Sequence, residues 1–154
     1  MPNPDRFGKL YLMPTPFENA QLNLQLYDLR REPVLREARQ WFLIEFTPDT
    51  FADMVALASG ERNASFRMVL SYWEMAASLV TTGAIDAAAF LAANNEIVAT
   101  FSKIQPFLSE LRAAVREPDF CRHFESVVMA IPDALDTLHR RRESIKAAKA
   151  AAKG

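Results

Sequence analysis

The sequence is poor in cysteine and glycine, which limits both its chemistry and its fold. Cys121 is the only cysteine, so an intramolecular disulfide is excluded. Four glycines, set against many alanines and leucines, favour helix over sheet. No apolar run reaches the roughly 18 residues that span a bilayer, and residues 1–16 lack the apolar core of a signal peptide. We therefore expect a cytoplasmic protein without a transmembrane segment.

Catalytic and phosphate-binding motifs are missing as well. The sequence has no Gly-x-Ser-x-Gly elbow and no glycine-rich phosphate loop. Its two histidines are His123 and His139, and the sequence lacks the repeated Glu-x-x-His motif of a four-helix di-metal site. The formal net charge of −1 predicts no general affinity for nucleic acid or membrane surfaces. These absences predict a protein that is not an enzyme and that has no cofactor and no metal.

A long apolar helix is predicted over residues 61–82. Its main apolar face recurs at steps of three and four and consists of Phe66, Val69, Leu70, Trp73, Ala77 and Val80. A second apolar face lies beside it and consists of Met68, Tyr72, Met75 and Leu79. A helix that is apolar around most of its circumference is normally enclosed by other helices. Gly83 is expected to end this helix in a left-handed conformation, with Asp86 capping the next one.

Four short motifs carry a resemblance to a known family. They are Tyr72-Trp73-Glu74-Met75-Ala76, Gly83-Ala84-Ile85-Asp86, Ile104-Gln105-Pro106 and Leu111-Arg112. With these motifs the chain resembles, over about residues 61–130, an uncharacterised bacterial domain-of-unknown-function family of small all-helical domains. The resemblance implies a fold and no activity, since function has to be argued from a site.

Helix start and stop signals divide the rest of the chain. Thr15-Pro16-Phe17-Glu18 and Thr47-Pro48-Asp49 are typical helix starts. The first helix should bury Leu22, Leu26 and Leu29. Pro106 lies inside a helix that carries Ile97, Phe101, Ile104, Leu108, Leu111 and Val115, and it should bend that helix.

These patterns predict an all-α protein, a single-domain helical bundle of about seven helices around the central helix 61–82. We expect residues 1–15 to form an extended N-terminal arm and residues 16–138 to form the helical domain. Residues 139–154 should form a basic, Ala/Lys-rich helical extension. Beyond Ile145 no large apolar residue remains, so this end is expected to fray or project.

A narrow polar stripe on the central helix holds the first candidate site. The stripe includes Arg67 and Glu74, and Glu74 follows Trp73 directly. One interpretation is a buried carboxylate that binds a ligand or a partner. The alternative is a carboxylate paired with Arg67 or with a distant arginine, because an unpaired buried carboxylate is costly.

The C-terminal extension holds the second candidate site. Its cations are Arg140, Arg141, Arg142, Lys146, Lys149 and Lys153. Four of them recur on one helical face and form a stripe that suits nucleic acid, an acidic protein or an anionic membrane. The alternative is a solubilising tail whose positive charge complements the helix dipole.

The function predicted first is a non-enzymatic interaction or regulatory domain that acts through protein–protein contacts, with a protein partner or a homo-oligomer. The first alternative is tethering to nucleic acid or an acidic surface through the basic C-terminal helix. The second alternative is a sensor of small apolar ligands, with a pocket lined by Trp73, Met75 and Phe101 and oriented by Glu74.

Overall fold

The computed structural model describes residues 13–154, and within these residues it is all-helical and has no strand. This confirms the predicted fold class. Of the predicted arm over residues 1–15, residues 1–12 lie outside the described residues. The α-helices, in chain order, are α1 (Pro16–Arg30), α2 (Pro33–Gln40), α3 (Phe51–Leu57), α4 (Asn63–Thr81), α5 (Ala87–Ala93), α6 (Glu96–Ile104), α7 (Leu108–Val115), α8 (Arg122–Met129) and α9 (Ala134–Ala152).

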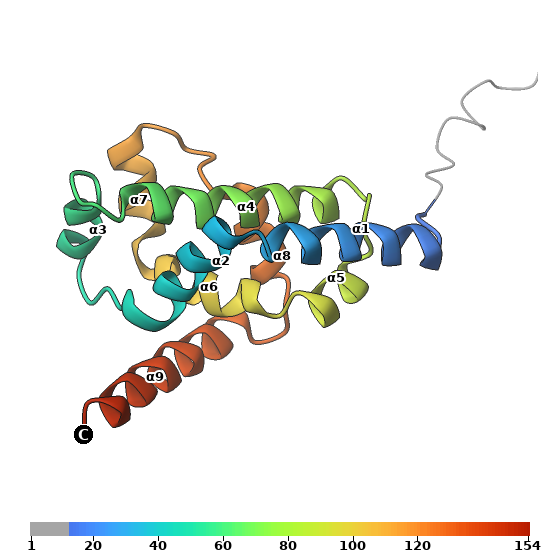
Figure 1. Ribbon diagram of the computed structural model, residues 1–154. Coiled ribbons are helices and arrows are strands. Elements are labelled where there is room, and N and C mark those ends of the chain that lie inside the picture. The colour runs from blue at the N-terminus through green and yellow to red at the C-terminus, as the bar shows by residue number, and fades with distance from the viewer. Residues whose placement is uncertain (1–12) are drawn as a thin grey trace, which may run out of the picture.

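The predicted central helix is α4, which runs through the middle of the molecule (Figure 1). Its buried residues are Phe66, Val69, Leu70, Tyr72, Trp73, Ala76 and Ala77. Val80, which the periodicity also placed inside, is only half-buried, since it lies in the last turn. The neighbours packed most extensively on α4 are α8 and α2. The central position predicted for residues 61–82 is therefore confirmed.

The ends of several helices follow the predicted capping chemistry. Glu18 N–H donates to Thr15 Oγ1 at 3.2 Å, and Thr15 N–H donates to Glu18 Oε2 at 2.8 Å, which is the expected capping box. Gly83 has a φ of +82°, and the backbone N–H of Ile85 donates to Leu79 O at 2.9 Å. Asp86 accepts from Ala89 N–H at 2.9 Å and so caps α5.

The start of α3 differs from the prediction. Thr47-Pro48-Asp49 remains non-helical, and α3 begins at Phe51 after Thr50. Thr50 and Asp53 form the capping box there, with Thr50 N–H donating to Asp53 Oδ2 at 2.8 Å. In this box the Thr50 side chain accepts from the backbone of Asp53, and the Asp53 side chain accepts from the backbone of Thr50. A start at Thr47 would lack the second bond, because the residue three positions later is not acidic.

Pro106 divides the helix predicted to contain it into two. A 3₁₀ turn, Gln105–Phe107, separates α6 from α7, and Leu108 N–H bonds to Gln105 O. The predicted bend is confirmed, because proline removes one backbone donor and clashes with the preceding turn. The bend directs α7 toward the end of the molecule where α3 lies (Figure 1).

One further irregular element was not predicted. After Gln40 the helix α2 widens into a single π-helical segment, Trp41–Glu45, which closes with Phe46 N–H donating to Trp41 O at 3.1 Å. Trp41, Phe42 and Phe46 pack there as one aromatic cluster, with the Trp41 and Phe46 rings stacked at 5.3 Å. π-helical turns are rare and are often found at functional positions.

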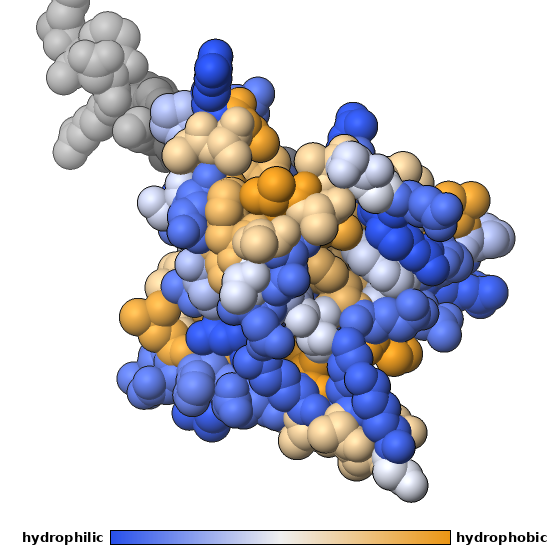
Figure 2. All heavy atoms as spheres, turned by 90° about the vertical axis from the view of Figure 1, so that its left-hand side faces the viewer, coloured by the Kyte–Doolittle hydropathy of each residue, from blue (hydrophilic) through white to orange (hydrophobic). Residues whose placement is uncertain are grey.

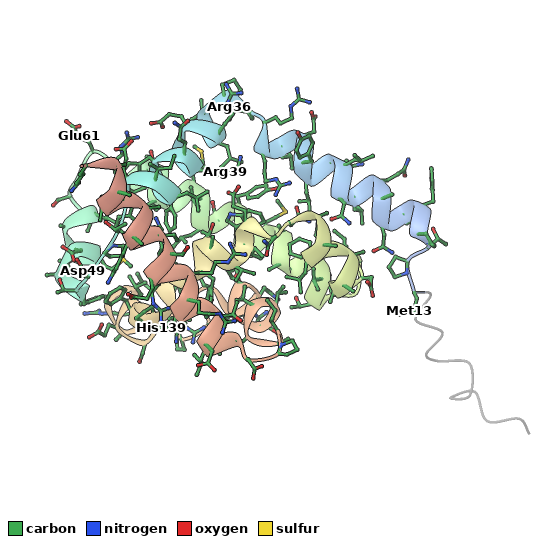
Figure 3. All side chains as sticks on the ribbon, turned by 90° about the horizontal axis from the view of Figure 1, so that it is seen from below. Met13, Arg36, Arg39, Asp49, Glu61 and His139 are labelled. Carbon is green, nitrogen blue, oxygen red and sulfur yellow. The ribbon has the colours of Figure 1, made fainter. Side chains whose placement is uncertain are left out.

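Helix α1 lies along one edge of the molecule (Figures 1 and 3). Its buried residues are Asn19, Leu26 and Arg30, whereas Leu22 is half-buried and Leu29 is 51 % exposed. The predicted stripe of Leu22, Leu26 and Leu29 is therefore wrong in part. The inward face has turned because Asn19 bonds Asp86 N–H at 2.7 Å and the Arg30 guanidinium lies 5.6 Å from the Trp73 ring.

The last helix is continuous to Ala152. In Figure 3 its C-terminal half lies beside Asp49, at the end of the molecule opposite Met13. The chain beyond Ile145 is thus part of α9, and Lys146 and Lys149 contact the body as described below, so the expectation of a frayed end is wrong. Residues 150–154 are exposed and extend beyond these contacts. Polar anchoring replaces the apolar face that this segment lacks.

Candidate functional site

A groove lies at the end of the molecule formed by α3, the start of α4 and α7. Figure 2 faces this end, where apolar side chains gather between polar ones. The groove has a volume of about 630 Å³. Its apolar walls are Phe51, Met54, Val55, Leu57, Ala58, Phe66, Leu111, Ala114, Val115 and Phe120, and its polar lining is Asn63, Arg67 and Glu117. Because Val55 and Val115 are 55 % and 47 % exposed, apolar surface is left open to solvent in this groove.

A second, smaller hollow continues from the groove along α4. It has a volume of about 270 Å³ and shares Phe66, Arg67 and Phe120 with the groove. Its other lining residues are Leu70, Ser71, Glu74 and Cys121. Arg67 therefore stands where the two hollows meet, as a single cation on a mainly apolar surface.

Arg67 is exposed, as the predicted polar stripe requires. Within residues 13–154 its guanidinium makes no ion pair and no side-chain hydrogen bond, so the predicted pairing with Glu74 does not occur. A guanidinium offers five donors in a fixed fork that matches a carboxylate. Of the residues predicted as a site, Arg67 is the one that the fold leaves available beside an apolar groove.

Glu74 has a structural partner that neither interpretation anticipated. Its carboxylate oxygens accept from the backbone N–H groups of His123 at 3.1 Å and Phe124 at 2.8 Å. These groups belong to the first turn of α8, whose donors have no partner inside the helix. The predicted arginine pair of Glu74 is therefore wrong: Glu74 caps α8 from a neighbouring helix, and its role as a ligand or partner contact stays a prediction.

The geometry before α8 explains why a carboxylate is needed from outside. Cys121 is the N-cap residue, has a φ of +57° and makes no side-chain cap bond. Cys121 is also buried and free, as expected for a small core residue. Burial, with the nearby negative charge of Glu74, raises the pKa of the Cys121 thiol to about 12, which removes it as a nucleophile near neutral pH.

Trp73 is fully enclosed rather than lining a pocket. Its ring is 0 % exposed and meets the Tyr72 ring edge-on at 5.0 Å, with the Arg30 guanidinium 5.6 Å away. Phe101 is also 0 % exposed, whereas Met75 is 40 % exposed on the outside. The predicted pocket of Trp73, Met75 and Phe101 is therefore wrong. The apolar hollow lies one to two turns earlier along α4.

The buried cation Lys103 escaped prediction. It is 3 % exposed, and its Nζ donates to Phe42 O at 2.6 Å, Leu43 O at 2.7 Å and Phe46 O at 2.5 Å. These carbonyls lie in and directly after the π-helical turn, where backbone acceptors lose their helical partners. A lysine between Ser102 and Ile104, on a helix that is buried on nearly all sides, was the available signal.

Burial lowers the pKa of Lys103 to about 7, and the nearby charge of Lys149 adds to this shift. The three carbonyl oxygens act in the opposite direction, because an ammonium group has three donors and a neutral amine has only two. Lys103 thus ties α6 to the end of α2 through one buried, fully bonded head group.

The predicted basic stripe on α9 faces the body of the protein at its middle and end. Lys149 Nζ donates to Glu45 O at 2.8 Å and to Thr47 Oγ1 at 2.6 Å. Lys146 pairs with Asp49 at 3.0 Å. Both lysines therefore hold α9 against the segment between α2 and α3.

Arg142 belongs to the same stripe and bonds Ser102 O at 3.0 Å and Gln105 Oε1 at 3.4 Å. Burial lowers the pKa of Arg142, although a guanidinium remains charged near neutral pH. Of the remaining predicted cations, Arg140 donates to Thr137 within α9, and Arg141 and Lys153 have no ion pair within the described residues.

Residues 13–154 contain no group of three or more His, Cys, Asp or Glu side chains placed so that it could hold a metal ion. Within these residues, no helix has both the length and the apolar character that a membrane crossing requires.

Comparison with known proteins gives one match. A protein-family model described as "Domain of unknown function (DUF4760)" matches residues 16–130, from the start of α1 to the end of α8. The match extends further toward the N-terminus than the resemblance over residues 61–130, and it leaves α9 outside. No curated protein and no solved structure matches the chain.

Proposed function

Because the chain belongs to the DUF4760 family of unknown function, we propose from its geometry that it is a protein-interaction domain whose α3–α4–α7 groove receives an apolar segment of a partner protein. The observation that carries this proposal is the open apolar groove with Arg67 at its edge, a cation that makes no ion pair and no side-chain hydrogen bond within residues 13–154. Grooves between helices commonly take an amphipathic helix, which buries apolar side chains at i, i+3 or i+4, and i+7.

The charges around the groove specify the partner further. Within the described residues Arg67 has no acidic partner of its own, so an acidic side chain next to the apolar anchors of the partner would pair with it. Such a pair at the rim adds specificity and orientation more than affinity. We propose binding rather than catalysis, because Glu74 caps α8 and Cys121 is buried in the core. The proposed place of this binding is the cytoplasm.

The test is site-specific photo-crosslinking in the cell of origin. A photoreactive amino acid replaces Val55 in the groove wall or, as a matched control, Leu135, which is equally exposed at 56 % but lies on α9. We expect a discrete crosslinked protein from position 55 and none from position 135. Arg67→Glu should abolish the crosslink. Equal crosslinking from both positions, or none from position 55, would contradict the proposal.

A second candidate rests on the smaller hollow beyond Arg67. A cation at the entrance of an apolar cavity of about 270 Å³ also suits a small amphiphile with an anionic head. This proposal keeps the predicted sensor of apolar ligands, but it places the pocket in the hollow that Phe66 and Leu70 of α4 form with Cys121. Native mass spectrometry of the protein purified from its own cells should then show an added small-molecule mass, which Leu70→Trp would displace.

Tethering through α9 is the weakest of the three proposals. Arg142, Lys146 and Lys149 have partners within the fold, so binding an external polyanion would compete with those contacts. Only Arg140, Arg141 and Lys153 would remain as ready contacts. Binding to a nucleic acid or an anionic vesicle should weaken steeply with salt if this proposal holds.

A further inference from the structure

The outer face of α1 carries an exposed apolar stripe. Phe17, Leu24 and Tyr27 are 69 %, 66 % and 53 % exposed, and Ala20 between them is exposed as well. The four residues follow one another at steps of three, four and three, which is the spacing of a coiled-coil seam. A stripe of this length on a solvated helix is unusual, because single exposed apolar residues are common but aligned ones indicate an interface.

No part of the described fold covers this stripe. The inward face of α1 is made by Asn19, Leu26 and Arg30, on the other side of the helix axis. Figures 1 and 3 show α1 along the rim of the molecule, and in Figure 3 side chains of α1 extend away from the body. The stripe is also remote from the α3–α4–α7 groove, so the inference below does not depend on the function proposed for that groove.

We propose that α1 pairs with α1 of a second copy of this chain, in antiparallel orientation, to form a two-fold symmetric dimer. In an antiparallel pair, a positions meet d positions. Phe17 then lies opposite Tyr27 of the second copy, and Ala20 lies opposite Leu24. Both pairs are symmetric about the same point, residue 22, which a two-fold interface requires.

The seam is complementary to itself in size. The aromatic rings of Phe17 and Tyr27 meet at each end, where ring pairs add stabilisation beyond their buried area. At the centre the small Ala20 faces the large Leu24, twice, so that the two helices approach closely without overpacking. A parallel pair would instead set Phe17 against Phe17 and Ala20 against Ala20, which leaves a gap at the centre.

The seam is also free of like-charge contacts. Gln21 and Asn23 flank the symmetry axis, so each meets its own counterpart, and an amide is both donor and acceptor. Asn23 Oδ1 already accepts from Asn94 at 2.9 Å, which leaves its N–H₂ group for the partner. At the ends, Asp28 meets Pro14 and Arg31 meets Met13 of the second copy, so no two equal charges face each other.

The size of the contact sets the expected strength. A helix of 15 residues is about 22 Å long, so one helix pair is smaller than a standard protein–protein interface. The dimer should therefore be reversible and depend on concentration. The dimer would carry two α3–α4–α7 grooves, one on each copy, so that a partner with two binding segments could occupy both at once.

Sedimentation velocity of the full chain tests the proposal. We expect the mass to rise with concentration from 17.4 kDa toward twice that value. Leu24→Glu should weaken dimerisation at least tenfold while leaving the circular dichroism spectrum unchanged. Leu29→Glu is the matched control, because Leu29 is 51 % exposed on the same helix but outside the stripe, and it should dimerise like the native chain.

Cysteine crosslinking tests the orientation. Ala20→Cys chains mixed with Leu24→Cys chains should form a disulfide-linked heterodimer, whereas Ala20→Cys mixed with Leu29→Cys should not. The native Cys121 is buried and does not compete. A chain that stays monomeric at millimolar concentration overturns the proposal. So does a dimer that Leu29→Glu disrupts and Leu24→Glu leaves intact.

Discussion

The carboxylate of Glu74, on α4, accepts the backbone N–H of Phe124, on α8, at 2.8 Å. A side chain on α4 thereby supplies the acceptor that the first turn of α8 requires, across a separation of 50 residues in the chain. The negative charge also lies at the positive end of the α8 dipole. The most extensive contact between two helices of residues 13–154, that of α4 with α8, is thus fixed in register by a polar contact as well as by apolar burial.

Glu74→Ala should destabilise the fold by about 1–2 kcal/mol, because it leaves two N-terminal donors of α8 without an acceptor. Glu74→Gln should cost less, since one amide oxygen can still accept. Thermal unfolding measures the effect, and hydrogen exchange should speed up at the amides of His123 and Phe124. Glu143→Ala, on the exposed surface of α9, is the control and should change little.

Lys103→Met should destabilise the protein by about 2–4 kcal/mol, although methionine fills a similar volume. The substitution leaves the carbonyls of Phe42, Leu43 and Phe46 without their shared donor. Lys149→Met removes bonds to Glu45 and Thr47 near the surface and should cost less than about 1 kcal/mol. Urea unfolding compares the two variants. A neutral Lys103→Met would mean that the carbonyls need no donor there.

Stability should depend on pH through Lys103. Its folded pKa of about 7 lies below the ordinary value of 10.5, so between these values the unfolded chain binds the extra proton. The free energy of unfolding should therefore rise as pH increases from about 7 toward 10, by at most about 1.4 kcal/mol per pH unit, and this dependence should be absent below pH 7.

The measurement is urea unfolding of the native chain and of Lys103→Met across this pH range. The difference between the two slopes isolates Lys103 from other titrating groups. Equal slopes in both proteins would show that the three carbonyls keep Lys103 charged throughout.

Arg116→Gly should stabilise the protein by roughly 0.5–1 kcal/mol. Arg116 ends α7 with a φ of +58°, a left-handed conformation that costs a non-glycine residue about 1 kcal/mol, and part of the gain is offset by the greater entropy of the unfolded chain. Arg116→Ala keeps the strained conformation and should bring no gain. Differential scanning calorimetry of both variants distinguishes relief of strain from loss of a charge.

The sequence was sufficient for those features that depend on periodicity and capping. The enclosure of Trp73, the left-handed Gly83, the capping box of Thr15 and the interruption at Pro106 all follow from local rules. The burial of α1 was predicted less well, because Leu22 and Leu29 on one side and Phe17 and Leu24 on the other are equally apolar. Only the polar contacts of Asn19 and Arg30 decide which side turns inward.

The candidate site was predictable in its charge but not in its geometry. Arg67 was identified because it interrupts an apolar helix, and its exposure follows from the same pattern. The groove beside it requires α3 and α7 to converge on α4, a long-range arrangement that no local spacing contains. The partners of Lys103 and Lys149 were not predicted for a related reason, since they include backbone carbonyls far away in the sequence, and every residue type carries a backbone carbonyl.

The contact of Lys149 with Glu45 joins positions that are 104 residues apart, and Lys149 lies in the last two turns of α9. Domains generally begin to fold from the N-terminus during synthesis. Until α9 has been synthesised, the carbonyl of Glu45 has no lysine from this helix to meet. Closure of this corner therefore has to wait until Lys149 has left the ribosome, and a premature stop codon between positions 134 and 149 would yield a protein with this corner still open.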